Sequence, residues 1–296
     1  MGEQCDVEDS VHSVRRLLRR NVREAVGGLN GEQVADLLLG GKMLRTRLAV
    51  RAAQSENRGR RHVERACVAV ELVHTATLCH DDVIDGATLR RGRPALWRQI
   101  GPRAAVLVGD LLLSRAFEVV ALTDPITVRT FAACVREVAL TEAVQELDGT
   151  PEPSEAERLR LARGKTGPLF AFAARAAGGE DTELRDTLQE AGYRIGTAYQ
   201  LADDLLDVVG SEPAAGKTLG TDAQRGVPTL PGMGPEGRRL ARRRLAELCR
   251  SATALLAPWP PVQEGVSDYL SQDLQPVLDR HLPGLRAAPG RAFRRP

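Results

Sequence analysis

The chain has 296 residues, of which 43% are hydrophobic, so it is long enough to bury a core in one or two domains. Its 41 basic and 39 acidic residues nearly cancel, and a formal net charge of +2 gives no indication of a nucleic-acid partner. The five cysteines are scattered without a Cys-x-x-Cys pair, which argues against a disulfide scaffold or a zinc ribbon. No apolar run reaches the ~18–20 residues of a membrane span, and residues 1–9 are acidic and lack an apolar signal core. We therefore expect a cytoplasmic protein without a membrane span.

Helical spacing of apolar residues runs through the chain and predicts an all-α fold. Val63, Cys67, Val70 and Val73 follow the i, i+3, i+4 pattern, and strand-like runs of β-branched and aromatic residues are missing. The segment 104–117 is expected to be a buried helix. Breaks between helices are predicted at residues 27–28, 40–41, 57–61, 149–154, 178–179 and 210–234.

The breaks leave no linker that would divide the chain, so residues 1–296 are predicted to form a single domain. Residues 1–10 and the basic, proline-containing segment 283–296 are expected to be disordered. The long break 210–234 is rich in glycine and proline, and a stretch of that size is usually a functional loop or disorder. We interpret it as a loop that covers a functional site.

Two clusters of the form Asp-Asp-x-x-Asp are the most informative motifs, and they comprise Asp81, Asp82 and Asp85, and Asp203, Asp204 and Asp207. On a helix, positions i and i+4 lie about 40° apart, so the first and last aspartates of each cluster share a face. Clustered carboxylates in apolar helices are costly without a compensating cation. One such cluster could equally be a solvated acidic helix end, but a matched pair indicates a metal site.

Lysine is nearly absent, since only three of the 41 basic residues are lysines. These are Lys42, Lys165 and Lys217, and each follows a glycine. A compact ammonium group is not replaceable by a planar guanidinium where a phosphate needs a point charge. We therefore interpret the three lysines as phosphate ligands at helix ends or in loops.

Carboxylate ligands suit Mg²⁺, which is bound by a few carboxylates together with substrate phosphates. Further positive charge would come from Lys42, Arg45, Arg90, Arg91, Lys165 and Lys217. Metal and cations together indicate a diphosphate, which is a good leaving group once its charge is neutralised. The sequence has no phosphate-binding Gly-x-x-x-x-Gly-Lys loop or dinucleotide fingerprint, so nucleotide chemistry is not favoured.

With these motifs the chain resembles the trans-isoprenyl diphosphate synthases, or polyprenyl synthetases, and in particular the geranylgeranyl diphosphate synthases. The likeness covers roughly residues 40–231, with motifs in the family's order at residues 40–45, 71–75, 80–85, 89–92, 109–112, 165–166, 199–204 and 216–217. It implies an all-helical bundle around a deep central cavity, usually in a homodimer. It also implies a Mg²⁺-dependent prenyltransferase that joins an allylic diphosphate to isopentenyl diphosphate.

The resemblance also implies a role for each matching residue. The catalytic residues would be Asp81, Asp82, Asp85, Asp203, Asp204 and Lys165, and the metal ligands Asp81, Asp85, Asp203 and Asp207. The allylic diphosphate would be held by Arg90, Lys165 and Lys217, with Thr166 and Gln200 near the reacting end. Isopentenyl diphosphate would be held by Lys42, Arg45, His74 and Arg91. Considered alone, His74 could be a core histidine and the arginine pair a solvated turn.

Product length is expected to depend on the helix that precedes the first cluster. Ala76 and Thr77 lie about one turn before Asp81, and one turn is about 5.4 Å. In this family bulky residues at such positions stop the growing chain early. Two small side chains therefore predict a product of about C20, geranylgeranyl diphosphate, or longer, with Phe117, Phe131 or another deep residue as the floor.

Three departures from the family pattern leave alternatives open. Val227 stands where the family often has a second lysine, Met43 and Thr46 replace a usual arginine and proline, and the segment after Pro231 is short. One alternative is a class I terpene cyclase that ionises an allylic diphosphate. The other is a regulatory subunit of a heteromeric synthase. The residues expected to bind isopentenyl diphosphate are all present, which argues against the cyclase. The complete aspartate clusters argue against the regulatory subunit.

Overall fold

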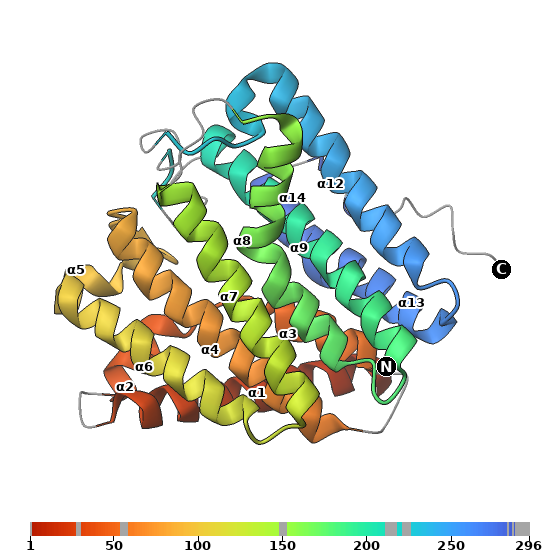
Figure 1. The fold of residues 1–296 in the computed structure, drawn as a ribbon, viewed down its shortest axis with the longest axis horizontal. Helices are drawn as coiled ribbons and strands as arrows, with labels where there is room; N and C mark the ends of the chain where they lie inside the picture. Colours follow the sequence, from red (N-terminus) through yellow and green to blue (C-terminus); the bar gives the residue numbers. More distant parts are fainter. Residues whose placement is uncertain are drawn as a thin grey trace.

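The computed structural model describes residues 2–27, 31–53, 59–147, 153–210, 218–220, 226–282, 284, 285 and 287. These residues are almost entirely helical, which confirms the predicted all-α fold (Figure 1). The helices are α1 Gly2–Val26, α2 Gly31–Leu38, α3 Leu44–Ala53, α4 Arg60–Ile84, α5 Leu96–Ile100, α6 Pro102–Val120, α7 Pro125–Leu147, α8 Glu155–Ala176, α9 Thr182–Val209, α12 Pro235–Leu255, α13 Pro260–Asp268 and α14 Gln275–His281. Shorter elements are the antiparallel strands β1 Leu89–Arg90 and β2 Arg93–Pro94, the 3₁₀ helix η1 Pro231–Met233 and the π-helix η2 Tyr269–Leu274.

The helices end near the predicted breaks, and local chemistry explains why. Helix α1 stops at Val26 because Gly27 adopts a left-handed φ of +60°. Helix α8 begins with a capping box, in which the Ser154 hydroxyl accepts the Glu157 amide and the Glu157 carboxylate accepts the Ser154 amide. Helix α9 ends at Val209, immediately before Gly210.

The expectation of disorder at residues 1–10 does not hold for residues 2–10, which form the first turns of α1. Val7 and Val11 are buried in the core, in a helix that packs on α4 and α6. The acidic residues between them lie on the outer side of an amphipathic helix. Disorder was expected from the acidic composition of this segment, which does not reveal the helical spacing of its valines.

At the other end of the chain, Leu285 and Ala287 are buried against α14 rather than free. The Gln275 side chain donates to the Leu285 carbonyl at 2.7 Å and accepts the Ala287 amide at 2.9 Å. The rest of the predicted disordered segment, like residue 1, lies outside the described residues.

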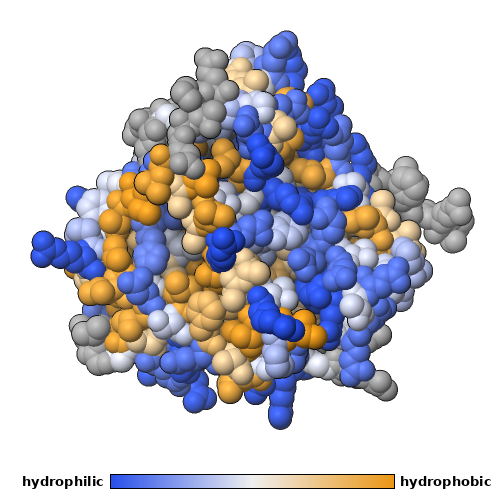
Figure 2. All heavy atoms as spheres, in the orientation of Figure 1, coloured by the Kyte–Doolittle hydropathy of each residue, from blue (hydrophilic) through white to orange (hydrophobic). Residues whose placement is uncertain are grey.

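Helix α6 corrects the expectation of a fully buried helix at residues 104–117. Leu107 is 61% exposed and Leu111 is 38% exposed, while Leu112 on the opposite side is fully buried. Similar exposure continues on α7, where Leu140 and Val144 face outward. Figure 2 shows the apolar side chains that gather over this side of the molecule. The periodicity of α6 could not distinguish its core side from an apolar outer side.

The core has two parts, with α8 between them. One part gathers around α1, α4 and α6, and the other around α3, α9, α12 and α13. Helix α8 contributes Leu169 and Phe172 to the first part and Phe170 and Ala174 to the second. The part of α8 that both core regions cover, residues 166–174, is buried throughout and apolar apart from Thr166, as expected of a helix segment that packs on two sides. No helix of the described chain is both long and apolar enough to cross a bilayer.

Small residues let α8 and α9 approach closely. A Cβ on Gly196 would lie 2.7 Å from the Gly167 Cα, and one on Gly192 would lie 2.6 Å from the Ala171 Cα. Both atoms that would be struck belong to the backbone, which cannot rotate away. The close approach brings the polar side chains of the two helices within hydrogen-bond distance.

We predict that Gly196→Ala lowers the free energy of unfolding by about 1–3 kcal/mol, because the added methyl group forces the two backbones apart. Urea denaturation followed by circular dichroism measures the change. Glu183→Gln, at an exposed position of the same helix, is the control and should shift stability by no more than about 0.5 kcal/mol. Equal stability of the Gly196→Ala variant and the wild type would show that the contact can relax.

Candidate active site

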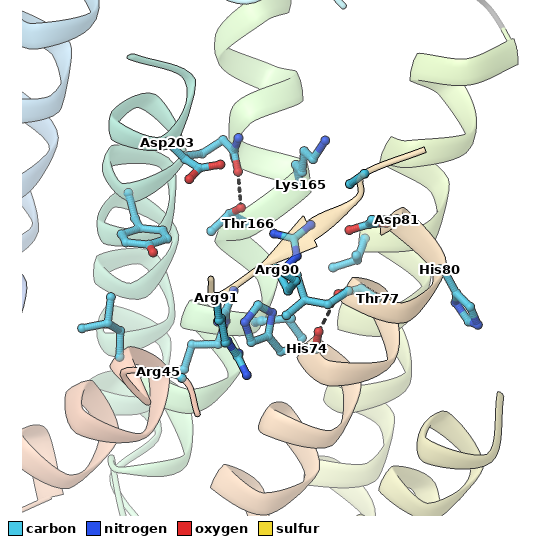
Figure 3. Close-up of a pocket in the computed structure, with 18 of the residues that line it drawn as sticks. Arg45, His74, Thr77, His80, Asp81, Arg90, Arg91, Lys165, Thr166 and Asp203 are labelled. Atoms are coloured by element: carbon cyan, nitrogen blue, oxygen red, sulfur yellow. Dashed lines mark hydrogen bonds between the residues drawn. The ribbon is translucent and has the colours of Figure 1, made fainter. Parts of the chain in front are cut away.

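A cavity of about 870 Å³ lies between α4, α7, α8 and α9, with the β1–β2 hairpin, residues 40–45 and α14 completing its wall. Figure 3 shows Asp81, Lys165 and Asp203 toward one end of this pocket and Arg45, His74 and Arg91 toward the other. All the residues of the predicted site that the structure describes lie in or next to this cavity, except for two aspartates that turn away from it.

The aspartates of the first cluster face two different places: two line the cavity, and one binds the β1–β2 hairpin. Asp81 and Asp85 line the cavity from the last turn of α4. Asp82 does not line the cavity. Its side chain is buried, at 3% exposed, and accepts hydrogen bonds from the Arg90 guanidinium, including one of 2.9 Å from Arg90 Nε to Asp82 Oδ1. Asp82 therefore holds the arginine of the hairpin rather than facing the cavity.

The second cluster has the same division. Asp203 and Asp207 line the cavity from α9, whereas Asp204 is buried and accepts the Gln200 amide at 2.7 Å. Gln200 in turn accepts the Thr166 hydroxyl of α8 at 2.5 Å. Residues 218–220 reach this cluster too, since the Gly220 amide donates to Asp207 Oδ1 at 3.0 Å. Asp204 thus fixes the polar pair Gln200 and Thr166.

Two pairs of carboxylates, one pair from each helix, therefore line the cavity and could each contribute oxygen ligands to a metal ion. Burial, opposed by the positive charge of Lys165, raises the pKa of Asp81 to about 7, as expected of a carboxylate that lacks a full counter-charge. No three histidine, cysteine, aspartate or glutamate side chains of the described chain lie close enough together to hold a metal ion. The donor set fits a hard cation whose remaining ligands come from water and phosphate.

The cations of the site lie around these carboxylates. Lys165 on α8 lies 3.6 Å from Glu142 of α7, and both line the cavity. Lys217 lies outside the described residues, but its neighbour Thr218 lines the cavity and accepts the amides of Thr88 and Leu89 at 3.2 Å. The chain after the second cluster is therefore in contact with the strand that leads to Arg90.

The Arg90-Arg91 pair lies at the tip of a tight hairpin. Arg91 and Gly92 have φ values of 54° and 73°, as in the type I′ turns that join two-residue hairpins. The Arg91 guanidinium donates to the Leu38 carbonyl and lies beside Gly41, where a Cβ would come within 2.8 Å of it. Arg91 thus supports the loop that carries Lys42.

Deeper in the cavity, Arg45 and His74 are held in an environment of low polarity. Arg45 is 8% exposed and lies 4.9 Å from the Phe170 ring, and its Nε has no hydrogen-bond acceptor among the described residues. Desolvation, reinforced by the charges of Arg45 and Arg91, holds the pKa of His74 well below its usual range. His74 is therefore neutral at pH 7 beside arginines that remain charged.

The apolar part of the cavity lies below the first cluster, where Ala76 and Thr77 both line it. Leu113 of α6, Val135 of α7 and Leu169 of α8 complete this wall. About one turn farther along each of these helices are Phe117, Phe131 and Phe172, whose rings pack edge to face with centroids 5.2 Å apart. The three rings therefore form one cluster that adjoins these wall residues along the helices but does not itself line the cavity.

Several lining residues carry no signal that the sequence analysis recognised. Glu142 and Glu146 form an i, i+4 acidic pair on α7, the same pattern that drew attention to the aspartates, and could have been found by it. Arg280, Val277 and Leu278 of α14 could not, because their place on the wall depends on how the end of the chain packs. Val227, which stands where the family often has a second lysine, does not line the cavity.

Comparison with known proteins assigns a family to this geometry. The model of the polyprenyl synthetase family matches residues 31–247. An all-trans-nonaprenyl-diphosphate synthase (geranyl-diphosphate specific) of Rhodobacter capsulatus is 32% identical over 86% of this chain and 82% of its own length. An octaprenyl diphosphate synthase of Haemophilus influenzae is 39% identical over 65% of this chain, and the match spans only 60% of that protein's length.

Comparison with solved structures gives the same family as comparison of sequences. The polyprenyl synthase of Caulobacter crescentus, complexed with calcium and isoprenyl diphosphate, superposes with a TM-score of 0.77 at 31% identity. The alignment covers 88% of this chain and 94% of that one. The chain belongs to the polyprenyl synthetase family.

Proposed function

We propose that the protein is a trans-prenyltransferase that joins an allylic diphosphate to isopentenyl diphosphate. The observation that carries this proposal is one cavity with three environments: carboxylates from α4 and α9, cations beside them, and an apolar extension below. A substrate that fits must carry an anionic head and a long apolar tail. The activities in the names of the two relatives, octaprenyl and nonaprenyl diphosphate synthase, have substrates of this kind.

Asp81, Asp85, Asp203 and Asp207 would hold Mg²⁺, which when bound neutralises charge on the leaving diphosphate. The polyprenyl synthase of Caulobacter crescentus was complexed with calcium and isoprenyl diphosphate, which supports the use of a divalent cation in this family. Lys165 and Arg90 would contact the same diphosphate, Arg90 in the orientation that Asp82 imposes. Loss of the diphosphate would leave an allylic cation in the cavity.

The second substrate would be held on the other side of the cavity. Lys42, Arg45 and Arg91 provide positive charge for the diphosphate of isopentenyl diphosphate. Neutral His74 would donate a hydrogen bond without adding charge next to the carbocation. The double bond of isopentenyl diphosphate would attack the allylic cation, and the departing diphosphate is a candidate acceptor of the proton that is then lost.

The product is proposed to be C20, geranylgeranyl diphosphate, or longer. Ala76 and Thr77 leave the cavity open below Asp81, and the Phe117, Phe131 and Phe172 rings lie beyond its end. We propose these rings as the floor that stops chain growth. The octaprenyl and nonaprenyl products named for the relatives favour the longer side of this range.

We also propose that the enzyme is a cytoplasmic homodimer in which α6 and α7 meet their counterparts. Leu107, Leu111, Leu140 and Val144 expose apolar surface on these two helices, which form a contiguous side of the molecule (Figure 2). A monomer seldom leaves so many large apolar side chains exposed on one side.

The proposed activity is tested with purified protein, Mg²⁺, farnesyl diphosphate and labelled isopentenyl diphosphate. We expect a longer labelled diphosphate, which a chelator abolishes and excess Mg²⁺ restores. Asp81→Ala and Asp203→Ala should each lower turnover by at least about 100-fold, because each removes a ligand of the Mg²⁺ that would neutralise the leaving diphosphate. Glu236→Ala, at an exposed position of α12, is the control.

The same assay separates the alternatives. An unlabelled hydrocarbon would identify a cyclase instead. Turnover only after a partner protein is added would identify a subunit of a heteromeric synthase. Near-normal rates of the two aspartate variants would exclude the metal role given to these residues.

For product length we predict opposite changes from two substitutions. Ala76→Phe should shorten the main product, because the ring fills the cavity below Asp81. Phe131→Ala should lengthen it by at least one isoprene unit, because it opens the proposed floor, although it also costs about 3–5 kcal/mol of stability. Mass spectrometry of the products measures both. If both variants make the wild-type product, the tail occupies another part of the bundle.

For the dimer, Leu107→Glu combined with Leu140→Glu should convert the protein to a monomer, because four carboxylates would be buried at a symmetric interface. Sedimentation velocity measures the change. Met233→Glu, which replaces another exposed apolar residue outside these helices, should leave the mass unchanged. A wild-type protein that sediments as a monomer would exclude the proposal.

A further inference from the structure

The residue before the first aspartate cluster, His80, binds a neighbouring helix. Its Nε2 lies 3.2 Å from the Val106 carbonyl oxygen of α6 and 3.3 Å from Asp110 Oδ1. A carbonyl oxygen can only accept a hydrogen bond, so Nε2 carries a proton and donates it to α6. Figure 3 shows the His80 ring turned away from Arg90 and Lys165. His80 is thus bound to α6 rather than to the groups proposed to hold substrate.

This contact depends on a glycine of α6. A Cβ on Gly109 would come within 2.6 Å of His80 Cδ2 and 2.9 Å of Cε1, and closer still to Nε2. Gly109 lies inside the helix and has no positive φ, so backbone conformation does not require a glycine there. Glycine weakens the interior of a helix. The space that it leaves for the imidazole ring therefore explains its presence.

The contact with α6 holds the end of α4 on a second side. Successive residues of a helix are about 100° apart, so His80 and Asp82 lie on nearly opposite sides of the axis. Asp82 is bound to Arg90 of the hairpin, and His80 is bound to α6. Asp81 and Asp85, at about 100° and 140° from His80, lie between these two contacts. Together the contacts oppose rotation of the turn whose carboxylates line the cavity.

This turn has little other packing to hold it. Helix α4 ends at Ile84, which is 49% exposed, and among residues 80–84, all of which the structure describes, only Asp82 is buried. The last turn of a helix lacks part of its hydrogen bonding and opens easily. Carboxylates that bind a metal must instead be held within about 0.5 Å of the productive geometry.

We propose that His80 is a positioning residue for the first pair of metal ligands. Held by the Val106 carbonyl and by the space over Gly109, it fixes the rotation of the last turn of α4 and thereby the direction of Asp81 and Asp85. This inference rests on the function proposed above and adds to it a residue that contacts neither metal nor substrate.

Hydrogen exchange of the protein without metal or substrate tests this role directly. In His80→Ala the amides of residues 81–86 should exchange at least about 5-fold faster than in the wild type, because the last turn loses one of its two contacts. His80→Gln, whose amide group can donate to the same carbonyl, should recover part of the protection. Wild-type exchange in His80→Ala would overturn the proposal.

His62→Ala is the matched control, because it removes a histidine from the other end of the same helix. The His62 side chain is 30% exposed and lies 3.9 Å from Asp124, whereas that of His80 is 27% exposed. The control should leave the exchange of residues 81–86 unchanged. Equal acceleration by both variants would indicate a general loosening of α4 and would contradict a specific role of His80.

A second variant displaces the ring without removing it. Gly109→Ala places a methyl group where the His80 ring lies, so it should accelerate the exchange of residues 81–86 as His80→Ala does. The two substitutions together should have no larger effect than one of them, because both remove the same contact. Additive effects would show that Gly109 acts through another contact, and the proposed clamp would then be wrong.

Asp110 requires a check of the oligomeric state. It lies beside Leu111 and one turn after Leu107, which are exposed on the proposed dimer face. Its own side chain is 59% exposed, and an ion pair at such a surface contributes little. Sedimentation velocity of His80→Ala should give the wild-type mass. A change of mass would assign its effects to the dimer interface and overturn the positioning role.

Metal affinity connects the clamp with the proposed reaction. Binding of Mn²⁺ in the presence of a non-reactive thiolo analogue of farnesyl diphosphate, followed by electron paramagnetic resonance, should be about 10-fold weaker for His80→Ala. The Mg²⁺ concentration for half-maximal activity should rise by a similar factor, while kcat at saturating Mg²⁺ changes little. Unchanged metal affinity, or a loss of kcat that excess Mg²⁺ does not restore, would exclude the role. If the wild type makes no product, the proposed function fails, and the exchange results still decide whether His80 holds the end of α4.

Discussion

The placement of carboxylates from α4 and α9 around one cavity is the constraint on which the other features of this molecule depend. Burial, opposed by the charge of Lys165, raises the pKa of Asp81 to about 7, so the charged form of this carboxylate is costly in its surroundings. The neighbouring aspartates avoid that cost, Asp82 by its ion pair with Arg90 and Asp204 by its hydrogen bond with Gln200. Each cluster therefore has two carboxylates that line the cavity and one that orients a neighbouring polar residue.

Such a site needs a rigid scaffold, and the packing of α8 supplies it. Glycines on α8 and α9 bring the two backbones together, and the same approach places Thr166 against Gln200. A slightly wider spacing would break that hydrogen bond and move Lys165 away from the second cluster. The small residues of these helices thus serve the geometry of the site as much as the density of the core.

The local features of this site could be predicted from the sequence, and the long-range ones could not. Helical periodicity placed Asp81, Asp85 and His74 on one face, and all three line the cavity. It could not say that Asp82, about 100° away on the same helix, would bind Arg90, because that pair depends on where the hairpin folds back. Arg280 was missed for the same reason, since its position follows from the packing of Asp273 on α3. The outer face of α6 was wrongly expected to be buried, because apolar residues predict burial without indicating which surface would cover them.

The order of environments in the cavity restricts how any substrate can lie. Under the proposed function, the carboxylates and Lys165 would hold the charged end of the substrate, and the wall formed by Leu113, Val135 and Leu169 would contact its apolar end. The second anion would bind on the side of Lys42, Arg45 and Arg91, where neutral His74 also lies. A positively charged histidine there would attract the second diphosphate more strongly but would oppose a carbocation beside it. The desolvation that keeps His74 neutral is therefore consistent with a reaction in which positive charge develops between two bound anions.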